Sequence, residues 1–443
     1  MKKTGLVLSG GGTKGAFEIG VWKALIEKDI AIDCVIGTSV GAINAAVIAQ
    51  NDFDLAYHFW NNLTINQVLK LNSDMADKYV NQWSGDSFDL FRLGFINDLF
   101  SGGLDISPLR ENLARLIDED KVRRSPVRLG LVTVELDTLK PVQLMIEDIP
   151  QGRLLDYLLA SAALPVFQRQ EIDGKTYLDG GFYDNLPINF MADSGYTNII
   201  AVDFPAPGFK KKIKEDHLNI KVVNNSEYLG MIMEFSQAVI QNNIQMGYLD
   251  CLKTFGYLHG RNYYFDIMGP HGFYDKLTDF IGTPLADAQA QQEIDLLLDL
   301  PPEADRDTVL LAIFSLLERT NYGREPSKMI SLLEMTGKSL NVPRLQAYSL
   351  DHFILALLTA LEKLTEDNLS FLKQADTIQK AFIENTDGYK PTTILDFISF
   401  YVLFVGAKND LPFTMLHTLI KKFTPEFTLS MMMLIEIHQL LNQ

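Results

Sequence analysis

The sequence predicts a protein of the α/β class, in which a mostly parallel central sheet is followed by an all-α C-terminal part. Two observations predict this class. Between residues 4 and 204, short β-rich runs alternate with stretches whose apolar residues recur at helical spacing. Beyond Pro301 and Pro302 the strand pattern almost disappears, and periodic helical segments follow one another. Alternation of the first kind is typical of parallel sheets with helices on their faces.

The strands and helices of the first part follow from local patterns. Thr4 to Leu8 is a short β-rich run, and Phe17, Val21 and Leu25 recur at helical spacing in the segment after it. Along the chain, strands are expected at Thr4 to Leu8, Cys34 to Ile36, Arg128 to Leu136, Pro141 to Ile146 and Asn198 to Phe204. Helices are expected between them at Ala16 to Lys28, Val40 to Gln50 and Leu154 to Ala163.

Two domains are expected, because a chain of 443 residues exceeds what one hydrophobic core usually serves. The double proline at 301 and 302 is the best boundary. We predict a first domain over residues 1–300, with a core at 4–205 and a helical extension at 206–300, and a helical domain over 301–443. Helices of the second domain are expected at Thr308 to Arg319, Leu345 to Leu364, Ile394 to Val405 and Glu426 to Leu441.

The composition excludes several classes of protein. A hydrophobic content of 47% with 21% charged residues is that of a globular chain. The formal net charge of −17 argues against a nucleic-acid partner, because neutralising phosphates needs a clustered basic surface. Two cysteines, Cys34 and Cys251, supply neither a disulfide framework nor a cysteine-rich zinc site, and no histidine spacing indicates a metal. A reducing compartment fits this composition.

No segment is expected to be a signal peptide or to span a membrane. The apolar run after Met1-Lys2-Lys3 is broken by glycines after about six residues, which is too short for a signal-peptide core. The apolar segment Phe397 to Ala407 falls far short of the ~20 residues needed to cross a bilayer. We expect a cytoplasmic protein, and the sequence leaves peripheral contact with membranes open.

A glycine-rich loop, Gly10 to Gly15, follows the first expected strand and matches the pattern G-x-G-x-x-G. Backbone amides at such a strand-to-helix turn can hold a dinucleotide pyrophosphate, or they can hold the oxyanion of an acyl intermediate. A dinucleotide fold needs an acidic residue at the carboxyl end of the second strand, about 20 residues past the glycines. Asp33 has this separation but precedes that strand.

A serine stands instead at the carboxyl end of the second strand, in Gly37-Thr38-Ser39-Val40-Gly41. The segment matches the nucleophile elbow G-x-S-x-G, in which flanking glycines leave room for a sharp strand-to-helix turn. The helix after Ser39 would point its positive end at the same place. Consecutive ends of parallel strands lie side by side, so we expect the glycine loop to face the Ser39 hydroxyl.

A third motif, Leu178-Asp179-Gly180-Gly181, completes a pattern that resembles the patatin-like phospholipases. The order of glycine loop, elbow and Asp-Gly-Gly turn is that of this family of serine acyl hydrolases, which use a Ser-Asp dyad instead of a triad. The resemblance covers residues 4–205, and Lys14 departs from it because many members carry arginine there. Supporting segments are Ala160 to Phe167, Gly103 to Leu109 and Glu135 to Thr138.

The resemblance implies a three-layer fold and a role for each motif. Ser39 would be the nucleophile, and Asp179 would activate it. The oxyanion hole would be formed by Gly10, Gly11, Gly12, Thr13, Lys14 and Gly15. Gly37 and Gly41 would shape the elbow, and Gly180 and Gly181 the turn after Asp179. No cofactor or metal is implied, and the implied substrates are carboxylic esters of lipids, most often phospholipids or lysophospholipids.

Asp179 needs an apolar setting to act as a base, since the unperturbed pKa of an aspartate is about 3.9. Tyr177, Leu178 and Phe182 are the side chains expected to supply it. A triad would need a histidine instead, and His217, His259 and His271 all follow Asp179. None lies in a compact turn after a strand, so each is expected to be solvated. Activity is then expected to persist below pH 6.5, where a free imidazole becomes protonated.

Substrate and partner contacts are less defined by the sequence. Phe88 to Phe100 and Met231 to Phe235 have the apolar content to line an acyl groove, or they are ordinary core. Lys210, Lys211, Lys212 and Lys214 either meet anionic headgroups or form a solvated loop. Two other functions remain open: a dinucleotide- or nucleotide-binding protein that uses Gly10 to Gly15, and a catalytically silent scaffold with a partner-binding helical tail.

Overall fold

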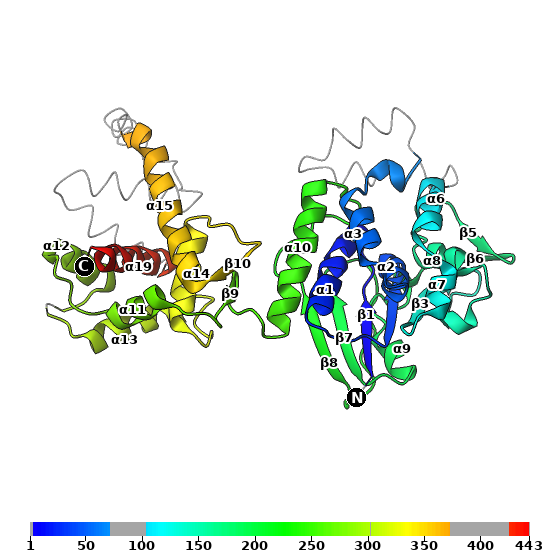
Figure 1. The fold of residues 1–443 in the computed structure, drawn as a ribbon, viewed down its shortest axis with the longest axis horizontal. Helices are drawn as coiled ribbons and strands as arrows, with labels where there is room; N and C mark the ends of the chain where they lie inside the picture. Colours follow the sequence, from blue (N-terminus) through cyan, green and yellow to red (C-terminus); the bar gives the residue numbers. More distant parts are fainter. Residues whose placement is uncertain (1–2, 71–102, 302, 373–424, 443) are drawn as a thin grey trace. The chain divides into compact units, whose positions relative to one another are not determined.

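A computed structural model describes residues 3–70, 103–301, 303–372 and 425–442 of the chain (Figure 1). The chain divides into two compact units, Met1–Gly256 and Tyr257–Gln443. The segments Phe88 to Phe100, Ile394 to Val405 and Phe397 to Ala407, for which the sequence makes predictions, lie outside the described residues.

The first unit is built on an eight-stranded sheet with the order β5-β6-β3-β2-β1-β7-β8, and β4 pairs with β3 beside this path. Its strands are β1 (Thr4–Leu8), β2 (Cys34–Thr38), β3 (Arg128–Glu135), β4 (Lys140–Met145), β5 (Gln170–Ile172), β6 (Lys175–Asp179), β7 (Asn198–Asp203) and β8 (Asn219–Asn224). The β2-β1, β1-β7, β7-β8 and β2-β3 pairs are parallel, whereas β4 and β6 run antiparallel to β3. The predicted mostly parallel sheet is therefore confirmed.

Helices cover both faces of this sheet, which gives the three layers that were expected. Val7 and Ile36 pack with Phe190 and Met191 of α9 on one face. Figure 1 shows α1, α2, α3 and α10 together in front of β1, β7 and β8. The helices of this unit are α1 (Ala16–Glu27), α2 (Val40–Ala49), α3 (Phe53–Asn61), α6 (Ser107–Leu116), α7 (Glu119–Arg124), α8 (Leu154–Ser161), α9 (Ile188–Asp193) and α10 (Gln237–Thr254), with short 3-10 turns η1 (Gly12–Gly15), η2 (Ile65–Gln67), η3 (Ile146–Asp148) and η4 (Gly180–Phe182).

The second unit is mostly helical, as the periodicity of the sequence predicts. Its helices are α11 (Gly272–Phe280), α12 (Ala288–Leu298), α13 (Arg306–Glu318), α14 (Lys328–Ser339), α15 (Leu350–Leu372) and α19 (Pro425–Leu441). It also contains a two-stranded parallel sheet of β9 (Tyr264–Asp266) and β10 (Ala347–Ser349). β10 falls inside the helix expected from Leu345, because it pairs with a strand far away in sequence that local periodicity does not reveal.

The chain divides into its two compact units after Gly256, whereas the sequence places the domain boundary at residue 300. The difference has a physical cause. Leu277, Ile281 and Ile294 are buried in the same hydrophobic cluster as the helices of the C-terminal part. Contacts therefore assign residues 257–300 to the second unit. The division into independently folding domains stays a prediction.

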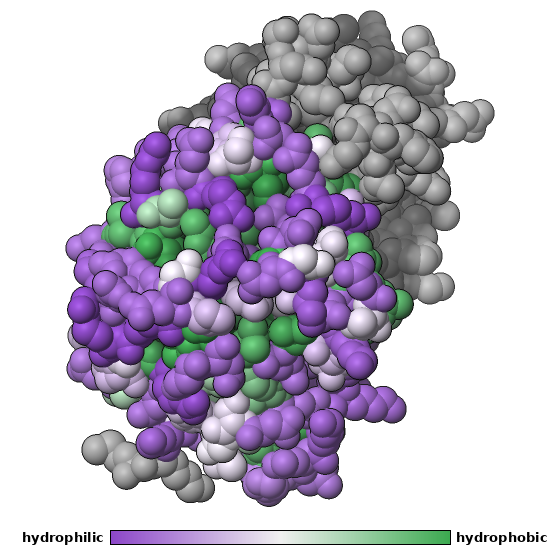
Figure 2. All heavy atoms as spheres, turned by 90° about the vertical axis from the view of Figure 1, so that its right-hand side faces the viewer, coloured by the Kyte–Doolittle hydropathy of each residue, from purple (hydrophilic) through white to green (hydrophobic). Residues whose placement is uncertain are grey.

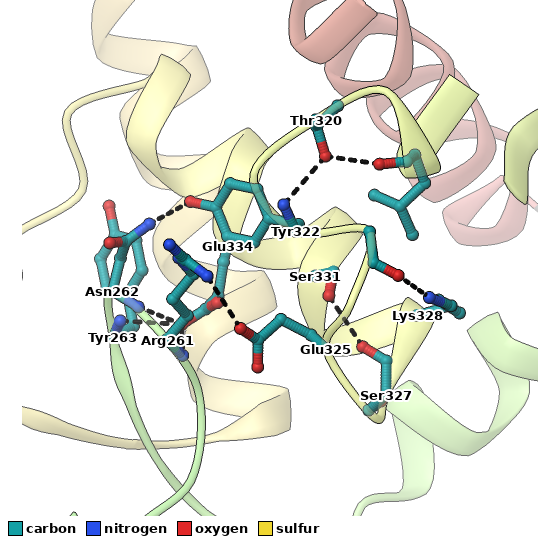
Figure 3. A network of polar contacts seen from close by, with 12 residues as sticks. Arg261, Asn262, Tyr263, Thr320, Tyr322, Glu325, Ser327, Lys328, Ser331 and Glu334 are labelled. Carbon is teal, nitrogen blue, oxygen red and sulfur yellow. Dashed lines mark hydrogen bonds and ion pairs between the residues drawn. The ribbon is translucent and has the colours of Figure 1, made fainter. Parts of the chain in front are cut away.

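A buried carboxylate organises the start of the second unit (Figure 3). Glu334, on α14, is 1% exposed, and its Oε1 accepts hydrogen bonds from the backbone N–H groups of Arg261, Asn262 and Tyr263 at 2.8, 2.9 and 2.8 Å. The Arg261 guanidinium forms an ion pair with Glu325 nearby at 3.1 Å. One side chain thus satisfies three consecutive backbone donors and fixes the turn that leads into β9.

Candidate active site

Ser39 occupies a strained turn between β2 and α2. Its backbone has φ 58° and ψ −127°, a conformation that costs a non-glycine residue energy and persists only where the surroundings enforce it. Gly41 is needed there, because a Cβ on it would lie 2.7 Å from the carbonyl oxygens of both Leu8 and Ser9. The geometry is that of a nucleophile elbow, with Ser39 at the positive end of α2.

Ser161, the last residue of α8, holds this turn in place. The Ser39 N–H donates to Ser161 Oγ at 2.9 Å, and the Ser161 hydroxyl donates to the carbonyl of Val132 on β3 at 2.7 Å. Thr38, the residue before the nucleophile position, donates its hydroxyl to the carbonyl of Asp184 at 2.8 Å. The elbow is therefore tied to the strand beside it and to the segment that follows Asp179.

Asp179 ends β6, on the far side of β3 from β2, and is 3% exposed. Its Oδ1 accepts the Gly181 N–H at 2.8 Å. Burial raises the pKa of Asp179 to about 6, against a smaller lowering by hydrogen bonding to Ser39 and Gly181. Its Oδ2 is buried and accepts no hydrogen bond of regular geometry from the described residues, although Ser39 lies close enough to affect the pKa of the carboxyl. Catalytic hydrogen bonds are often loose before substrate binds.

The glycine loop lies against the elbow. A Cβ on Gly10 would stand 2.9 Å from Cβ of Ser39, so the two backbones approach closely. Three backbone N–H groups of the loop already donate hydrogen bonds to backbone carbonyls. Gly10 donates to Asn185 O at 3.2 Å, Thr13 to Ile232 O at 2.9 Å and Lys14 to Gly11 O at 3.3 Å. Within the described part of the chain, the N–H groups of Gly11 and Gly12 have no such partner. They are the amides of this loop left to bind an anion.

Gly12 has a backbone that excludes other residues. Its φ is +59°, and a Cβ would lie 1.9 Å from the carbonyl oxygen of Ile232. Lys14 has turned inward, and its Nζ donates to the carbonyl of Pro205 at 2.7 Å, while burial lowers the pKa of its ammonium. Lys14 therefore anchors the loop rather than presenting its charge to the site.

Asp33 lies at the wrong end of β2 for a ribose contact. It precedes Cys34, the first residue of the strand, and its Oδ2 accepts the backbone N–H of Thr4 at 2.8 Å. The glycine loop follows the opposite end of the neighbouring β1, about 16 Å away at ~3.3 Å per residue. This placement disfavours the dinucleotide alternative.

An apolar cavity opens at Ser39. It holds about 620 Å³ of empty space, including its open mouth, and Gly12, Thr13 and Ser39 lie in its wall. The remaining lining is apolar and includes Val40, Ile43, Trp60, Leu113, Met233 and Phe235. No charged side chain of the described residues lines it. Met233 and Phe235, from the segment Met231 to Phe235, lie in this lining, and whether an acyl chain occupies the cavity stays a prediction.

The three histidines considered for a triad lie outside this cavity's lining. His217 is exposed and forms a contact with Glu215 at 3.2 Å, as expected for a solvated residue. His259 belongs to the second unit, where its backbone pairs with Phe265. His271 differs from the expectation of a solvated side chain: both of its ring nitrogens are buried without a hydrogen-bond partner at the start of α11.

Sequence reasoning missed a buried polar relay beside the site. Asn44, on α2, donates to the carbonyl of Gly15 at 2.9 Å and to Glu18 at 2.7 Å, and accepts from the Trp60 indole at 3.0 Å. Burial raises the pKa of Glu18 well above its ordinary value. The relay connects the glycine loop, the elbow helix and the cavity wall. The sequence could have indicated this network through Glu18 and Asn44, which are polar residues inside otherwise apolar helical segments.

Phe182 also departs from its expected role. It was one of three side chains expected to shield Asp179, but it is 48% exposed, whereas Tyr177 is buried.

In the described ranges no group of three or more His, Cys, Asp or Glu side chains is arranged to hold a metal ion. Among the same residues, no helix is both long and apolar enough to cross a membrane.

Comparison with known proteins agrees with the geometry. Residues 6–192 match the family model of patatin-like phospholipases. Over 208 residues the chain is 29% identical to the patatin-like phospholipase domain-containing protein ZK370.4 of Caenorhabditis elegans, which covers 45% of this chain and 13% of that protein. It is 27% identical over 208 residues to the lysophospholipase nte1 of Aspergillus terreus, covering 46% of this chain and 12% of that protein.

A further similarity is to the solved structure of VipD from Legionella pneumophila, with 14% identity, a TM-score of 0.38 and 90% of each chain covered. The curated relatives are much longer proteins, and this chain spans only about an eighth of their length. What is shared is the segment that carries the glycine loop, the elbow and the Asp-Gly-Gly turn. Residues 6–192 of this chain therefore match the patatin-like phospholipase family, and the match contains all three motifs.

Proposed function

We propose that this protein is a serine hydrolase that cleaves carboxylic esters of lipids, with Ser39 as nucleophile and Asp179 as its base. The observation that carries the proposal is that Ser39 lies in the wall of an apolar cavity, where the Gly10 backbone approaches it closely and the buried carboxyl of Asp179 interacts with it. The family match adds to it, because the family model that matches residues 6–192 is one of phospholipases.

The chemistry follows from the positions of these groups. Oγ of Ser39 attacks the ester carbonyl carbon, and its proton passes to Oδ2 of Asp179. The carbonyl oxygen becomes an oxyanion that the N–H groups of Gly11 and Gly12 can bind, and each such donor contributes roughly 2.7 to 4 kcal/mol to lowering the barrier. Collapse of the intermediate expels the alcohol, which takes the proton from Asp179. Water then attacks the acyl-enzyme by the same route and releases the fatty acid.

The cavity supports an acyl chain as the part of the substrate that is recognised. Ile43 and Trp60 present apolar surface directly beyond Ser39, and burying the methylene groups of a fatty acyl chain there is favourable by about 0.8 kcal/mol per group. The lysophospholipase nte1, one of the relatives, is named for cleaving a single-chain phospholipid. We therefore place phospholipids and lysophospholipids first among the substrates.

The two alternatives make different predictions. A nucleotide-binding protein would bind NAD or NADP through the glycine loop, and the position of Asp33 argues against this. A silent scaffold would keep the fold and lose reactivity at Ser39. Titration with NAD and NADP tests the first, and reaction with an acyl-ester probe tests the second.

The deciding experiment uses a fluorophosphonate, which labels activated serines covalently, followed by a panel of phospholipids and lysophospholipids. The parent protein should be labelled at Ser39 and should release fatty acid. Ser39→Ala should lose both, while Ser9→Ala, a change of the neighbouring buried serine, should keep labelling. Labelling that persists in the Ser39→Ala protein would overturn the assignment.

A further inference from the structure

Large apolar side chains are exposed on the loops that surround the candidate active site. They are Phe182, Phe209, Ile213, Tyr228 and Met231, here called the apolar rim, and their exposed fractions lie between 37% and 75%. The rim residues lie on the turn after β6 and on the loops after β7 and β8. Single exposed apolar residues are common on proteins, and the face drawn in Figure 2 shows hydrophobic patches scattered among hydrophilic residues. Five on the three segments that follow β6, β7 and β8 are more than isolated exposure.

Backbone hydrogen bonds hold the loop after β7 against the Asp-Gly-Gly turn. The N–H of Phe209 donates to Gly181 O at 2.9 Å, and the N–H of Asn185 donates to Phe209 O at 2.6 Å. Further along, the side chain of Asn189 accepts the N–H of Lys214 at 3.0 Å and donates to Lys212 O at 2.9 Å. Phe182 and Phe209 are therefore held beside each other on a fixed backbone.

The loop after β8 joins the rim to the cavity. The Thr13 hydroxyl donates to Met231 O at 3.1 Å, and the Thr13 N–H donates to Ile232 O at 2.9 Å. Met233, two residues on, lines the cavity together with Phe235, whereas Met231 is exposed. One segment thus carries apolar surface from the outside to the wall beside Ser39.

The glycine loop lies between these two loops. Lys14 is bonded to Pro205 of the loop after β7, and its Nζ lies 5.8 Å from the ring centroid of Tyr228 on the loop after β8. A Cβ on Gly11 would meet the Phe204 ring at 2.5 Å. The rim therefore surrounds the backbone that approaches Ser39.

Lysines border the rim but are partly neutralised. Lys210 pairs with Asp203, Lys214 approaches Asp193 at 4.0 Å, and Lys211 lies over the Tyr183 ring. Their aliphatic stems extend apolar surface while the ammonium groups stay in water. Apolar contact therefore dominates, with a smaller contribution from the cations to binding of anionic headgroups.

We propose that the apolar rim is the surface by which this protein binds a lipid aggregate, with the cavity mouth facing the lipid. The proposal deepens the proposed function and rests on it for the identity of the lipid substrate. A lipid surface fits better than a second protein because the rim is continuous with a cavity that has no charged lining residue among those described. An acyl chain can then pass from the aggregate to Ser39 without crossing water.

The test measures partition of the Ser39→Ala protein onto vesicles, so that binding is read without hydrolysis. Vesicles of phosphatidylcholine alone and with phosphatidylglycerol are compared by flotation. Phe209→Ser with Tyr228→Ser should lower the partition coefficient by about a hundredfold on both kinds of vesicle, since each aromatic side chain is expected to account for about tenfold. Lys211→Gln with Lys212→Gln should lower it only on the anionic vesicles.

The matched control is Leu139→Ser with Leu311→Ser, because both leucines are 71% exposed and neither belongs to the rim. It should bind vesicles as the parent does. Equal binding by the rim variant and the parent, equal loss in the control, or no binding by the parent would each overturn the proposal. Sedimentation velocity gives one further outcome: self-association lost in the rim variant without a change in vesicle binding would assign the rim to a second copy of the chain.

Failure of the rim and failure of the proposed function are distinguishable. If the parent protein binds vesicles but is not labelled by fluorophosphonate, the apolar rim is supported as a lipid-binding surface and the proposed hydrolase function is rejected. If the parent protein is labelled and hydrolyses esters while the rim variant binds vesicles normally, the proposed hydrolase function is supported and the role of the apolar rim in lipid binding is rejected. Thermal unfolding of every variant checks that a loss of binding does not come from a loss of fold.

Discussion

The backbone N–H of Ser39 donates a hydrogen bond to the hydroxyl of Ser161 at 2.9 Å, and this hydroxyl donates in turn to Val132 O at 2.7 Å. Ser161 is fully buried, so both partners depend on it. Ser161→Ala should leave a buried donor and acceptor unpaired, which costs about 1 to 3 kcal/mol of stability. Because the strained elbow then loses one of its constraints, turnover of a short ester should fall more than its KM rises.

Urea unfolding and short-ester kinetics measure the two effects of Ser161→Ala. Ser161→Thr keeps the hydroxyl and is the matched variant, expected to retain more activity than alanine. A Ser161→Ala protein with parental kcat would show that the elbow keeps its geometry without this hydrogen bond.

Asp179→Asn tests the base. Asparagine keeps the oxygen that accepts the Gly181 N–H but removes the basic carboxylate, so turnover should fall by about 10² to 10⁴ with less change in substrate binding. Asp173→Asn is the matched control, since Asp173 lies in the exposed β5-β6 turn at φ 52°, a backbone conformation that asparagine tolerates. Short-ester kinetics of both variants, compared with the parent, provide the measurement.

The pH dependence of activity follows from the raised pKa of Asp179. A general base must be deprotonated, so activity should fall as pH drops through about 6. This differs from the expectation that the activity of a dyad persists as pH falls through about 6.5, because burial brings the pKa of the carboxyl close to the unperturbed histidine value of about 6.5. The pH profile alone cannot separate the two mechanisms. His217→Gln, His259→Gln and His271→Gln should each keep the profile of the parent, and a shifted profile in one of them would indicate a triad.

Because Asp179 is buried, its ionisation lowers the free energy of unfolding above pH 6. Its folded pKa of about 6 lies above the unfolded value of about 3.9, so the folded protein binds the proton more tightly. This destabilising contribution is absent below about pH 4, grows between pH 4 and 6, and is complete above pH 6. Asp179→Asn should therefore be more stable than the parent at pH 8, by about 3 kcal/mol at most, and should lose this advantage at pH 4. Thermal unfolding at both pH values measures the difference.

The parts of the fold that sequence predicts well are those set by local patterns. β1 matches its predicted bounds, and α1, β2 and α2 match within a few residues, because apolar periodicity and the glycines at 10 to 15 and 37 to 41 act locally. The short strands β5 and β6 were missed: β6 pairs with β3, more than 40 residues earlier, and β5 is a three-residue strand that pairs only with β6. The closeness of Gly10 and Ser39 was predictable from parallel strand order.

Other properties of the candidate site depend on tertiary packing. The pKa of Asp179 comes from burial, which no neighbour in sequence determines. Ser161 lies in a segment that the family resemblance includes, yet its hydrogen bond to Ser39 joins residues 122 positions apart. The cavity likewise draws its walls from Ile43, Leu113 and Phe235, which come together only in the folded chain.

Ile43→Trp should shorten the acyl chains that the protein accepts. Ile43 lies one turn beyond Ser39 on α2 and lines the cavity, so an indole there would fill space that a long chain needs. We expect the ratio of kcat/KM for a dodecanoyl ester to that for an acetyl ester to fall at least tenfold, which corresponds to about 1.4 kcal/mol. Ile43→Leu conserves volume and should keep the parental ratio. An unchanged ratio in Ile43→Trp would place the acyl chain elsewhere.

Glu334→Ala should destabilise the second unit. The change removes the acceptor of three backbone N–H groups in a buried position, and we expect a loss of about 3 kcal/mol or more. Glu334→Gln retains one oxygen and should lose less. Glu325→Gln, which removes only the exposed ion pair with Arg261, should change stability by less than about 1 kcal/mol. Urea unfolding of the three variants measures these losses, and a Glu334→Ala protein as stable as Glu325→Gln would contradict the role of this carboxylate.

Truncation tests where the first domain ends. Ser39, Asp179, the glycine loop and the cavity all lie within Met1–Gly256, so a fragment of residues 1–256 should fold and hydrolyse a short ester within about threefold of the full chain, a difference below about 0.7 kcal/mol. A fragment of residues 1–300 ends at the boundary that the sequence predicts. It should expose Leu277, Ile281 and Ile294, which are buried in the helical core of the second unit, and should aggregate. Size-exclusion chromatography and cooperative thermal unfolding compare the two fragments. If the 1–300 fragment is monomeric and active while 1–256 is not, residues 257–300 belong to the first domain and the division by contacts does not mark a folding boundary.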